Sequence, residues 1–446
     1  MNPRKEKSLA KLLWIIFAAF IVYGTALPFR FHMGGDYLRM RAGKIDWFPL
    51  LTSSLGAPDS GDWLQNLLLF IPFGFLGYVA IADKQARWKP YAVTALGLAL
   101  SAGVEFLQLF SETRFTAFSD VLLNTLGTGL GVRFGMGLRG EVFRLNSRPL
   151  LRRLLDAEPA YPALLFLLIA SAGAWMPFDF ALSWKTLWAK IQYLPDTFHF
   201  PDFASGDLLT FSRYACFSYF VCRLFRTAGF SGGRMSGALC TWGLGLFLEA
   251  GQYLVRSQCP DFKGALILTL GITAGLGASF LPSFRSRPLA WGTLITVWFA
   301  SAIAFANVYP FHFTGFTGGI NWIPFLPQNP NPSFFTLSGF LQEATAYSSV
   351  GVMWAYLLPK TGAGKRLGLY LTLGFALASG VLMEILRRGL PGGIADMTWL
   401  LGALTGAMAG WLLLARGWPM YWDYVRLKAP EKNPNAATDS NRNSPQ

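Results

Sequence analysis

Three polar clusters interrupt apolar segments of this sequence, and their residue types are those that bind ions or transfer protons. Each cluster starts with a Glu, has a Gln or Arg three residues later, and continues with an Arg and an Asp. The members are Glu105, Gln108, Arg114, Asp120 and Asn124, then Glu249, Gln252, Arg256 and Asp261, then Glu384, Arg387, Arg388 and Asp396. A carboxylate can serve as a general base, and an arginine binds phosphate or carboxylate through two parallel hydrogen bonds.

The first cluster has the spacing of a helix end followed by a turn. Glu105 and Gln108 are three residues apart, so they share one helix face. A bare carboxylate in a membrane costs several kcal/mol unless it is paired or protonated. Arg114 and Asp120 are the nearest partners, and Asn124 follows Asp120 by one turn. Two interpretations stay open, a ligand site and a clamp that holds the helical hairpin together.

The elements that carry these clusters have the composition of membrane helices. The 446 residues are 53% hydrophobic and only 14% charged, whereas soluble domains carry about 25% charged residues. The apolar runs are continuous rather than alternating, which favours helices over a barrel. We expect about twelve transmembrane helices in an all-α polytopic membrane protein, near residues 9–27, 63–82, 91–110, 117–138, 157–177, 207–225, 235–255, 262–282, 289–309, 337–358, 366–386 and 394–415.

Other sites of binding or catalysis have no motif in the sequence. The net charge of +14 fits Lys and Arg retained in cytoplasmic loops better than it fits nucleic-acid binding. The four cysteines lack CxxC spacing and the three histidines form no metal-spaced cluster, so we expect neither a metal nor a cofactor. No phosphate-binding loop or nucleophile elbow occurs. The catalytic residues, if the protein is an enzyme, are therefore not identified.

Sequence motifs recur three times in one order, which predicts internal repeats. A Pro-Phe-x-Phe motif is followed by an Ile-x-aromatic-x-Pro motif, then by the Glu cluster, then by a helix with spaced glycines. The two loop motifs stand at 27–31 and 45–49, at 176–180 and 191–195, and at 309–313 and 320–324. We expect three parallel four-helix repeats and a disordered tail, with boundaries at 1–142, 143–285, 286–428 and 429–446.

The distribution of positive charge predicts the orientation in the membrane. Lys and Arg gather before the first helix of each repeat and before span eleven, so these loops and both termini should be cytoplasmic in a bacterial inner membrane. The loop 310–336 contains no Lys or Arg. The Glu clusters should then lie near the outer leaflet, where Arg114, Arg256 and Arg388 are available for an anionic ligand.

The first repeat resembles the VanZ-like family over about residues 10–138. The matching pattern is an N-x-x-x-F-x-P-x-G-F helix, an E-x-x-Q helix end, and then R, D and D-x-x-x-N-x-x-G. The matching residues are Asn66, Phe70, Pro72, Gly74, Phe75, Glu105, Gln108, Arg114, Asp120, Asn124 and Gly127. We add Asn66 to the first cluster as a candidate site residue, so the first repeat has the full polar set. Repeats two and three match in part, because they lack the Asn66-type helix and have Ala265 and Leu400 where the first has Asn124.

The resemblance implies an integral membrane protein of the cell envelope, since the founding member of the family is linked to low-level teicoplanin resistance. Three functions remain open at this point. The first is binding or moving an anionic lipid or a lipid-linked envelope precursor at the outer leaflet. The second is a membrane-embedded enzyme that modifies such a component, with Glu105 or Asp120 as the base. The third is a structural or assembly role. Membrane lipids are the expected partners.

Overall fold

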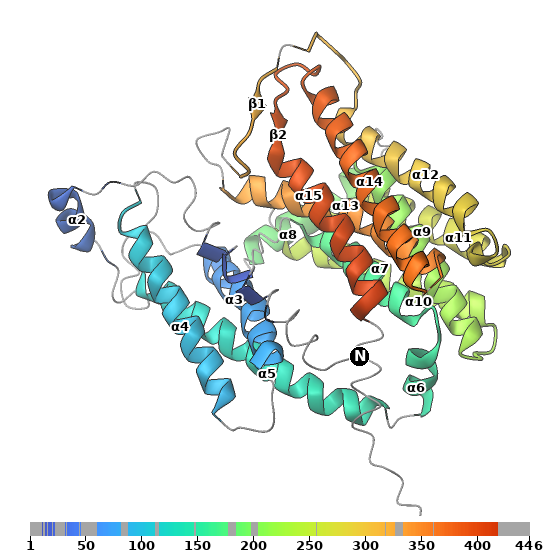
Figure 1. Cartoon of the computed structure of the whole chain (residues 1–446), viewed down its shortest axis with the longest axis horizontal. Helices are drawn as coiled ribbons and strands as arrows, with labels where there is room; N and C mark the ends of the chain where they lie inside the picture. The colour runs from blue at the N-terminus through green and yellow to red at the C-terminus, as the bar shows by residue number, and fades with distance from the viewer. Residues whose placement is uncertain are drawn as a thin grey trace, which may run out of the picture.

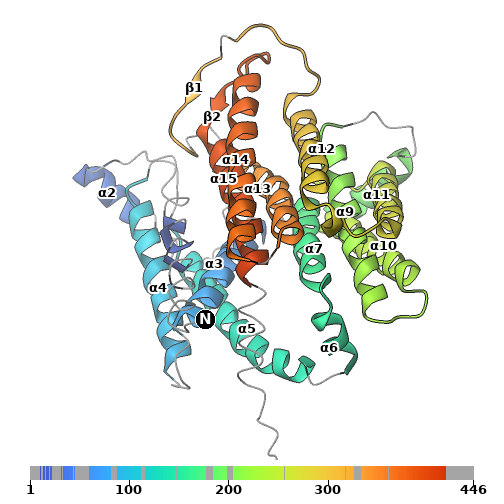
Figure 2. The same cartoon turned by 45° about the vertical axis from the view of Figure 1, so that its right-hand side comes forward.

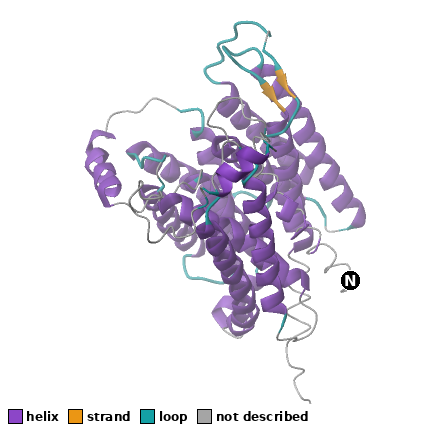
Figure 3. Ribbon diagram, turned by 90° about the vertical axis from the view of Figure 1, so that its left-hand side faces the viewer, coloured by secondary structure: helices purple, strands orange, loops and turns teal. Residues whose placement is uncertain are grey.

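The computed structural model describes most of the chain as helices. It covers residues 60–417 apart from 82–87, 112–115, 147–148, 177–183, 198–203, 256, 317, 326–332 and 360. Before residue 60 it covers residues 11, 14–15, 17–19, 21–22, 32, 34–43 and 45. Within these residues the only sheet is a pair of two-residue strands at one end of the helices (Figures 1 and 3). The all-α fold class is confirmed.

The first group of helices covers the part of the chain up to residue 156. Its helices are α2 (Gly35–Ala42), α3 (Ser60–Ile81), α4 (Lys89–Gln108), α5 (Phe118–Asn146) and the short α6 (Pro149–Asp156). Helices α3, α4 and α5 pack on one another, and they lie to one side of the later helices (Figure 2).

The second and third groups share an extensive apolar interface. The second contains α7 (Ala160–Trp175), α8 (Trp184–Tyr193), η1 (Leu194–Thr197), α9 (Asp207–Thr227), α10 (Gly233–Gly251), η2 (Gln252–Leu254), α11 (Phe262–Phe280) and η3 (Phe284–Ser286). The third contains α12 (Pro288–Val308), β1 (Ile320–Asn321), α13 (Ser333–Leu357), α14 (Gly362–Arg387), β2 (Ala395–Asp396), α15 (Met397–Leu412) and the π-helical turn η4 (Leu413–Gly417). Helix α7 packs on α13, and α9 packs on α12. Phe220 of α9 contacts both Phe166 and Tyr356 within this shared core.

The predicted glycine-spaced helices make the closest helix contacts in the structure. Helices α5, α11 and α15 pack on α3, α9 and α13, respectively. In each pair, a Cβ atom added to a glycine would collide with a carbonyl oxygen of the partner helix; examples are Gly131 on Ile71, Gly275 on Ala215 and Gly410 on Ser348. Small residues allow this approach, which is the usual basis of packing between membrane helices.

Five described helices are long and apolar enough to cross a membrane, which is fewer than the sequence count of about twelve. They are Lys89–Gln108, Phe262–Phe280, Pro288–Val308, Gly362–Arg387 and Met397–Arg416. Asn66–Ile81 and Ala160–Trp175 are apolar but shorter. Polar residues account for part of the difference, because α9 alone carries Asp207, Arg213, Arg223 and Arg226. The apolar helices indicate a membrane protein.

We predict that Gly131→Ala destabilises the protein while Gly129→Ala does not. Gly131 has the carbonyl oxygen of Ile71 in the place where a Cβ would stand, whereas nothing lies within 4 Å of a Cβ at Gly129. Overpacking costs about 1–3 kcal/mol, and a Gly→Ala change in a helix is neutral or favourable where there is open space for the Cβ. Unfolding midpoints in mixed detergent micelles test this prediction, and equal midpoints for the two variants would contradict it.

Candidate functional site

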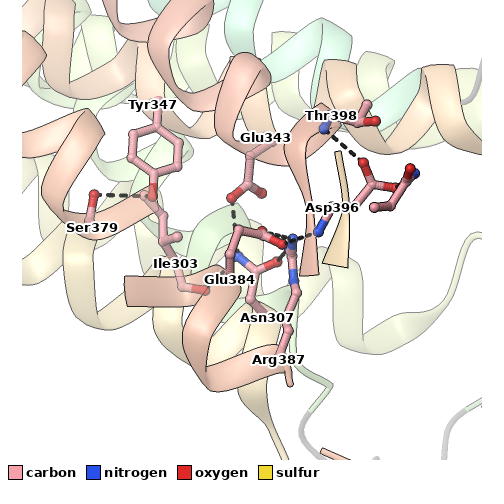
Figure 4. Close-up of polar contacts among 10 residues, drawn as sticks. Ile303, Asn307, Glu343, Tyr347, Ser379, Glu384, Arg387, Asp396 and Thr398 are labelled. Carbon is pink, nitrogen blue, oxygen red and sulfur yellow. Dashed lines mark hydrogen bonds and ion pairs between the residues drawn. The ribbon is translucent and has the colours of Figure 1, made fainter. Parts of the chain in front are cut away.

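Glu384 holds the start of the following helix through its carboxylate. It lies near the end of α14, is 4% exposed, and its Oε2 accepts a hydrogen bond from the backbone N–H of Asp396 at 2.6 Å. Asp396 in turn caps α15, because its Oδ1 accepts from the N–H of Thr398 at 2.8 Å (Figure 4). A side-chain acceptor at this position satisfies an N–H group that has no partner within the helix. Glu384 is therefore a clamp between α14 and α15.

The third Ile-x-aromatic-x-Pro motif is joined to this clamp. Its residues Ile320 and Asn321 form β1, which pairs in parallel with β2, so that Asn321 lies opposite Asp396. The Asn321 side chain donates from Nδ2 to Asp396 Oδ2 at 3.1 Å. The motif therefore docks the loop after α12 on the beginning of α15.

Arg387 neutralises Glu384 from within the same helix. Its guanidinium forms an ion pair with Glu384 and donates to Asn307 Oδ1 of α12, and it lies 4.7 Å from the ring centre of Trp399. Asn307 also donates from Nδ2 to Glu343 Oε1 of α13 at 3.5 Å (Figure 4). The third cluster is thus a network across α12, α13 and α14, in which the charge of Glu384 has an internal partner.

Glu105 makes the corresponding clamp in the first group of helices. It is 5% exposed, and its Oε2 accepts from the backbone N–H of Ala117 at 3.1 Å. Ala117 follows Glu105 by twelve residues, and Asp396 follows Glu384 by the same number. The Thr116 hydroxyl adds a bond to the Glu105 carbonyl oxygen at 3.2 Å. Both carboxylates therefore support the turn to the next helix.

Asp120 does not occupy the position of the other two aspartates. Asp261 and Asp396 precede α11 and α15 as N-caps, and each follows its Glu by twelve residues. Asp120 follows Glu105 by fifteen residues and lies inside the first turn of α5. The position equivalent to the N-caps is Ala117. The sequence comparison matched Asp120 with Asp261 and Asp396 because all three are aspartates. By distance from the Glu, Asp120 lies three residues, about one helical turn, beyond their position.

The remaining residues of the first cluster are distributed over three helices. Asn66 lies half-buried on α3, and Gln108 ends α4. Asn124 is buried on α5 and donates from Nδ2 to the hydroxyl of Ser101 on α4 at 2.9 Å. Asn124 therefore joins α5 to α4 below the Glu105 clamp.

Of the three arginines proposed from the sequence to bind an anion, the structure describes one. Arg114 and Arg256 lie outside the described residues. Arg388 donates from Nε to the carbonyl oxygen of Gly318 at 2.7 Å, so it binds its own loop. The arginine with the strongest indication of ligand binding is a different one, on α9.

Glu249 differs from the other two glutamates in its partners. Its Oε1 accepts from the hydroxyl of Tyr214 at 3.2 Å, and its Oε2 accepts from Nε2 of Gln252 at 2.8 Å. Asp261 caps α11 separately, through the N–H of Gly264 at 2.6 Å. No cation within the described part of the chain pairs with Glu249.

Glu249 and Gln252 face a polar cavity of about 400 Å³ between the second and third groups of helices. It lies at the ends of α7, α10 and α12, at the beginning of α9 and beside Gln342 and Glu343 in the first half of α13. Its lining includes Asp207, Thr210, Arg213, Tyr214, Glu249, Gln252, Gln258, Asn307, Gln342 and Glu343. Ligand cavities have volumes of roughly 300–1,000 Å³, so this one is large enough for a small polar group.

Arg213 is the functional candidate that our reading of the motifs missed. It is 9% exposed, it lines the cavity, and it packs against Gly173, where a Cβ would collide with its guanidinium. Its Nη2 donates to the Thr345 hydroxyl at 3.3 Å, while its Nε has no hydrogen-bond partner. No carboxylate in the described residues pairs with it. The available signal was that Arg213 is the one charged residue between Asp207 and Arg223 in a segment predicted to cross the membrane, which by default suggests function.

The glycine contacts also identify a shared polar position on α3, α9 and α13. Gly127, Gly271 and Gly406 approach the carbonyl oxygens of Leu67, Phe211 and Ala344. The residues just before these three are Asn66, Thr210 and Glu343. The later groups therefore carry a polar residue where the first has Asn66, although its type differs and the sequence pattern did not reveal it.

The chemistry available in the cavity is that of polar and ionic recognition. Amide, hydroxyl, carboxylate and guanidinium groups converge there from α9, α10, α12 and α13 and from the residues that follow α10. Within the described residues, no group of three or more His, Cys, Asp or Glu is placed to hold a metal ion. The arrangement is suited to binding a charged group that makes several hydrogen bonds.

We predict that Glu384→Ala destabilises the protein by about 3 kcal/mol or more, because it leaves Arg387 without its buried partner and the Asp396 N–H without its acceptor. The double variant Glu384→Gln with Arg387→Gln should be much more stable, since it removes both charges and keeps an acceptor oxygen. Unfolding midpoints in mixed micelles measure the difference. A single variant as stable as the wild type would show that the clamp is unimportant.

Comparison with known proteins supports the resemblance seen in the first part of the sequence. No curated protein and no solved structure matches the chain significantly. The match to a family model covers α3, α4, most of α5 and the helical residues before them. Residues 12–138 match the VanZ/LLP1 family, so the first part of this membrane protein is VanZ-like.

Proposed function

We propose that this protein binds, and in doing so helps to move, a lipid or lipid-linked envelope precursor through its anionic group. The observation that carries this proposal is the buried Arg213, which lines a polar cavity and has no carboxylate partner in the described residues. An unpaired guanidinium in an apolar surrounding is costly, and a phosphate or carboxylate supplies the missing charge and two hydrogen-bond acceptors.

We place the cavity near the outer leaflet of a bacterial inner membrane, with both termini in the cytoplasm. The positive residues Arg152, Arg153, Arg285 and Arg287 precede α7 and α12. The cavity lies at the opposite ends of these two helices. The positive-inside rule supports this orientation. A ligand would then enter from the side where envelope precursors are used.

We also propose that the chain consists of three four-helix units and about twelve membrane helices. One supporting observation is that the helix pairs α3–α5, α9–α11 and α13–α15 each pack closely through glycines. The glycines Gly127, Gly271 and Gly406 all follow the Glu of their unit by 22 residues. In this arrangement Glu105 and Glu384 are clamps, and the second unit uses its equivalent, Glu249, to line a site.

The VanZ-like first part connects this proposal to the envelope. The resemblance to a family linked to teicoplanin resistance suggests that the ligand belongs to cell-wall or membrane-lipid metabolism. A change in teicoplanin susceptibility is therefore the expected cellular consequence of ligand binding.

We predict that purified protein binds phosphatidylglycerol and that Arg213→Gln weakens the binding by about tenfold or more, because a charge-assisted, bidentate contact is lost. Arg152→Gln is the matched control, since Arg152 is an exposed arginine on α6 far from the lining residues. Titration of the detergent-solubilised protein, followed by native mass spectrometry, measures the bound lipid.

Cells that produce the two variants at equal levels provide the second readout. Arg213→Gln should shift teicoplanin susceptibility to that of cells without the protein, and Arg152→Gln should not. Unchanged lipid binding and unchanged susceptibility in folded Arg213→Gln protein would overturn the proposal.

A further inference from the structure

The cavity between the second and third helix groups is lined by Arg213 and by Glu249, and neither forms an ion pair within the described residues. Arg213 has no acidic partner and Glu249 has no basic partner within the described residues. Of the other two acidic residues of the lining, Asp207 forms an ion pair between its Oδ2 and Nζ of Lys263 at 3.2 Å. Glu343 has no ion pair within the described residues and accepts a hydrogen bond from Nδ2 of Asn307 at 3.5 Å, beside the Arg387 network.

Comparison of α10 with α14 shows what Glu249 lacks. In α14, the residue three positions after the Glu is Arg387, whose guanidinium neutralises Glu384. After the end of α10, the equivalent residue is Gln252, the first residue of η2, which donates one hydrogen bond to Glu249 but brings no positive charge. Within the described residues, no internal cation takes the place beside Glu249 that Arg387 has beside Glu384.

We propose that this cavity binds a zwitterionic head group, with its phosphate on Arg213 and its amine on Glu249. The proposal rests on the proposed function and narrows the ligand from any anionic lipid to one that also carries a primary ammonium group. A phosphate accepts two parallel hydrogen bonds from a guanidinium. An ammonium group has three N–H donors, which suit a carboxylate and neighbouring amide oxygens.

Ligands with a single charge match the lining less well. An anion alone would lie in the same cavity as the unneutralised Glu249, and a cation alone would face Arg213. A charge buried without a partner is strongly unfavourable. The amide side chains of Gln252, Gln258 and Gln342 line the same space, and their oxygens can accept hydrogen bonds from an amine.

The test compares two lipids that differ in the amine, together with a soluble form of the same head group. Purified full-length protein in detergent is titrated with short-chain phosphatidylethanolamine, phosphatidylglycerol and phosphoethanolamine, and bound ligand is measured by native mass spectrometry. We expect phosphatidylethanolamine to bind about tenfold more tightly than phosphatidylglycerol. Competition by phosphoethanolamine at similar concentrations assigns the site to the head group alone; no competition shows that the acyl chains contribute.

Glu249→Gln is the decisive variant, because an amide keeps an acceptor for Tyr214 while it removes the negative charge. This variant should abolish the preference for phosphatidylethanolamine. Its affinity for phosphatidylethanolamine should fall about tenfold, and its affinity for phosphatidylglycerol should stay the same or rise. Asp156→Asn, at an exposed acid on α6, is the matched control and should keep the preference. The melting temperature of each variant confirms that it is folded.

The outcomes separate this inference from the function on which it rests. If wild-type protein binds both lipids equally and Glu249→Gln changes neither, the zwitterion inference is wrong, while anion binding at Arg213 stands. If wild-type protein binds neither lipid, the proposed function fails and the inference fails with it. The inference is supported if folded Glu249→Gln protein loses the preference for phosphatidylethanolamine while Asp156→Asn protein keeps it.

Discussion

The need of every buried charge for a partner is the constraint that organises this protein. A carboxylate removed from water is stable only when hydrogen bonds or an opposite charge replace the lost hydration. Glu384 obtains both, from the Asp396 N–H and from Arg387. Glu105 accepts a hydrogen bond from the backbone N–H of Ala117. The turns that start α5 and α15 depend on these contacts, and the glycine-rich helix pairs then fix how closely those helices approach α3 and α13.

Glu249 has the position in its helix group that Glu105 and Glu384 have in theirs, but in our account it has a different role. Gln252 stands where the third group has Arg387, so the charge of Glu249 is not neutralised from within its own helix. Arg213 introduces the opposite charge on α9, and the cavity brings both charges to one space. In our proposal, the structural role and the binding role of this motif are divided between helix groups by the substitution of single residues.

Much of this architecture could be predicted from the sequence, because it depends on local spacing. The helix ends at Glu105, Glu249 and Glu384 and the close-packed glycines follow from short patterns that apolar helices impose. The cavity could not be predicted, since Arg213 and Glu343 are 130 residues apart and meet only through the packing of α9 against the third group. Asp120 was misaligned because residue type is a weaker guide than distance from the Glu. The contact of Asn321 with Asp396 was missed because it joins a loop to a helix 75 residues later.

An experimental structure of the protein in lipid nanodiscs tests the central claim most directly, because it shows what fills the space between α7, α9, α10, α12 and α13. Our account predicts density for a small charged group in contact with both Arg213 and Glu249, with the Glu384–Arg387 pair intact. The account would be contradicted by a collapsed space in which Arg213 and Glu249 pair directly with each other, because the chain would then satisfy both charges without a ligand.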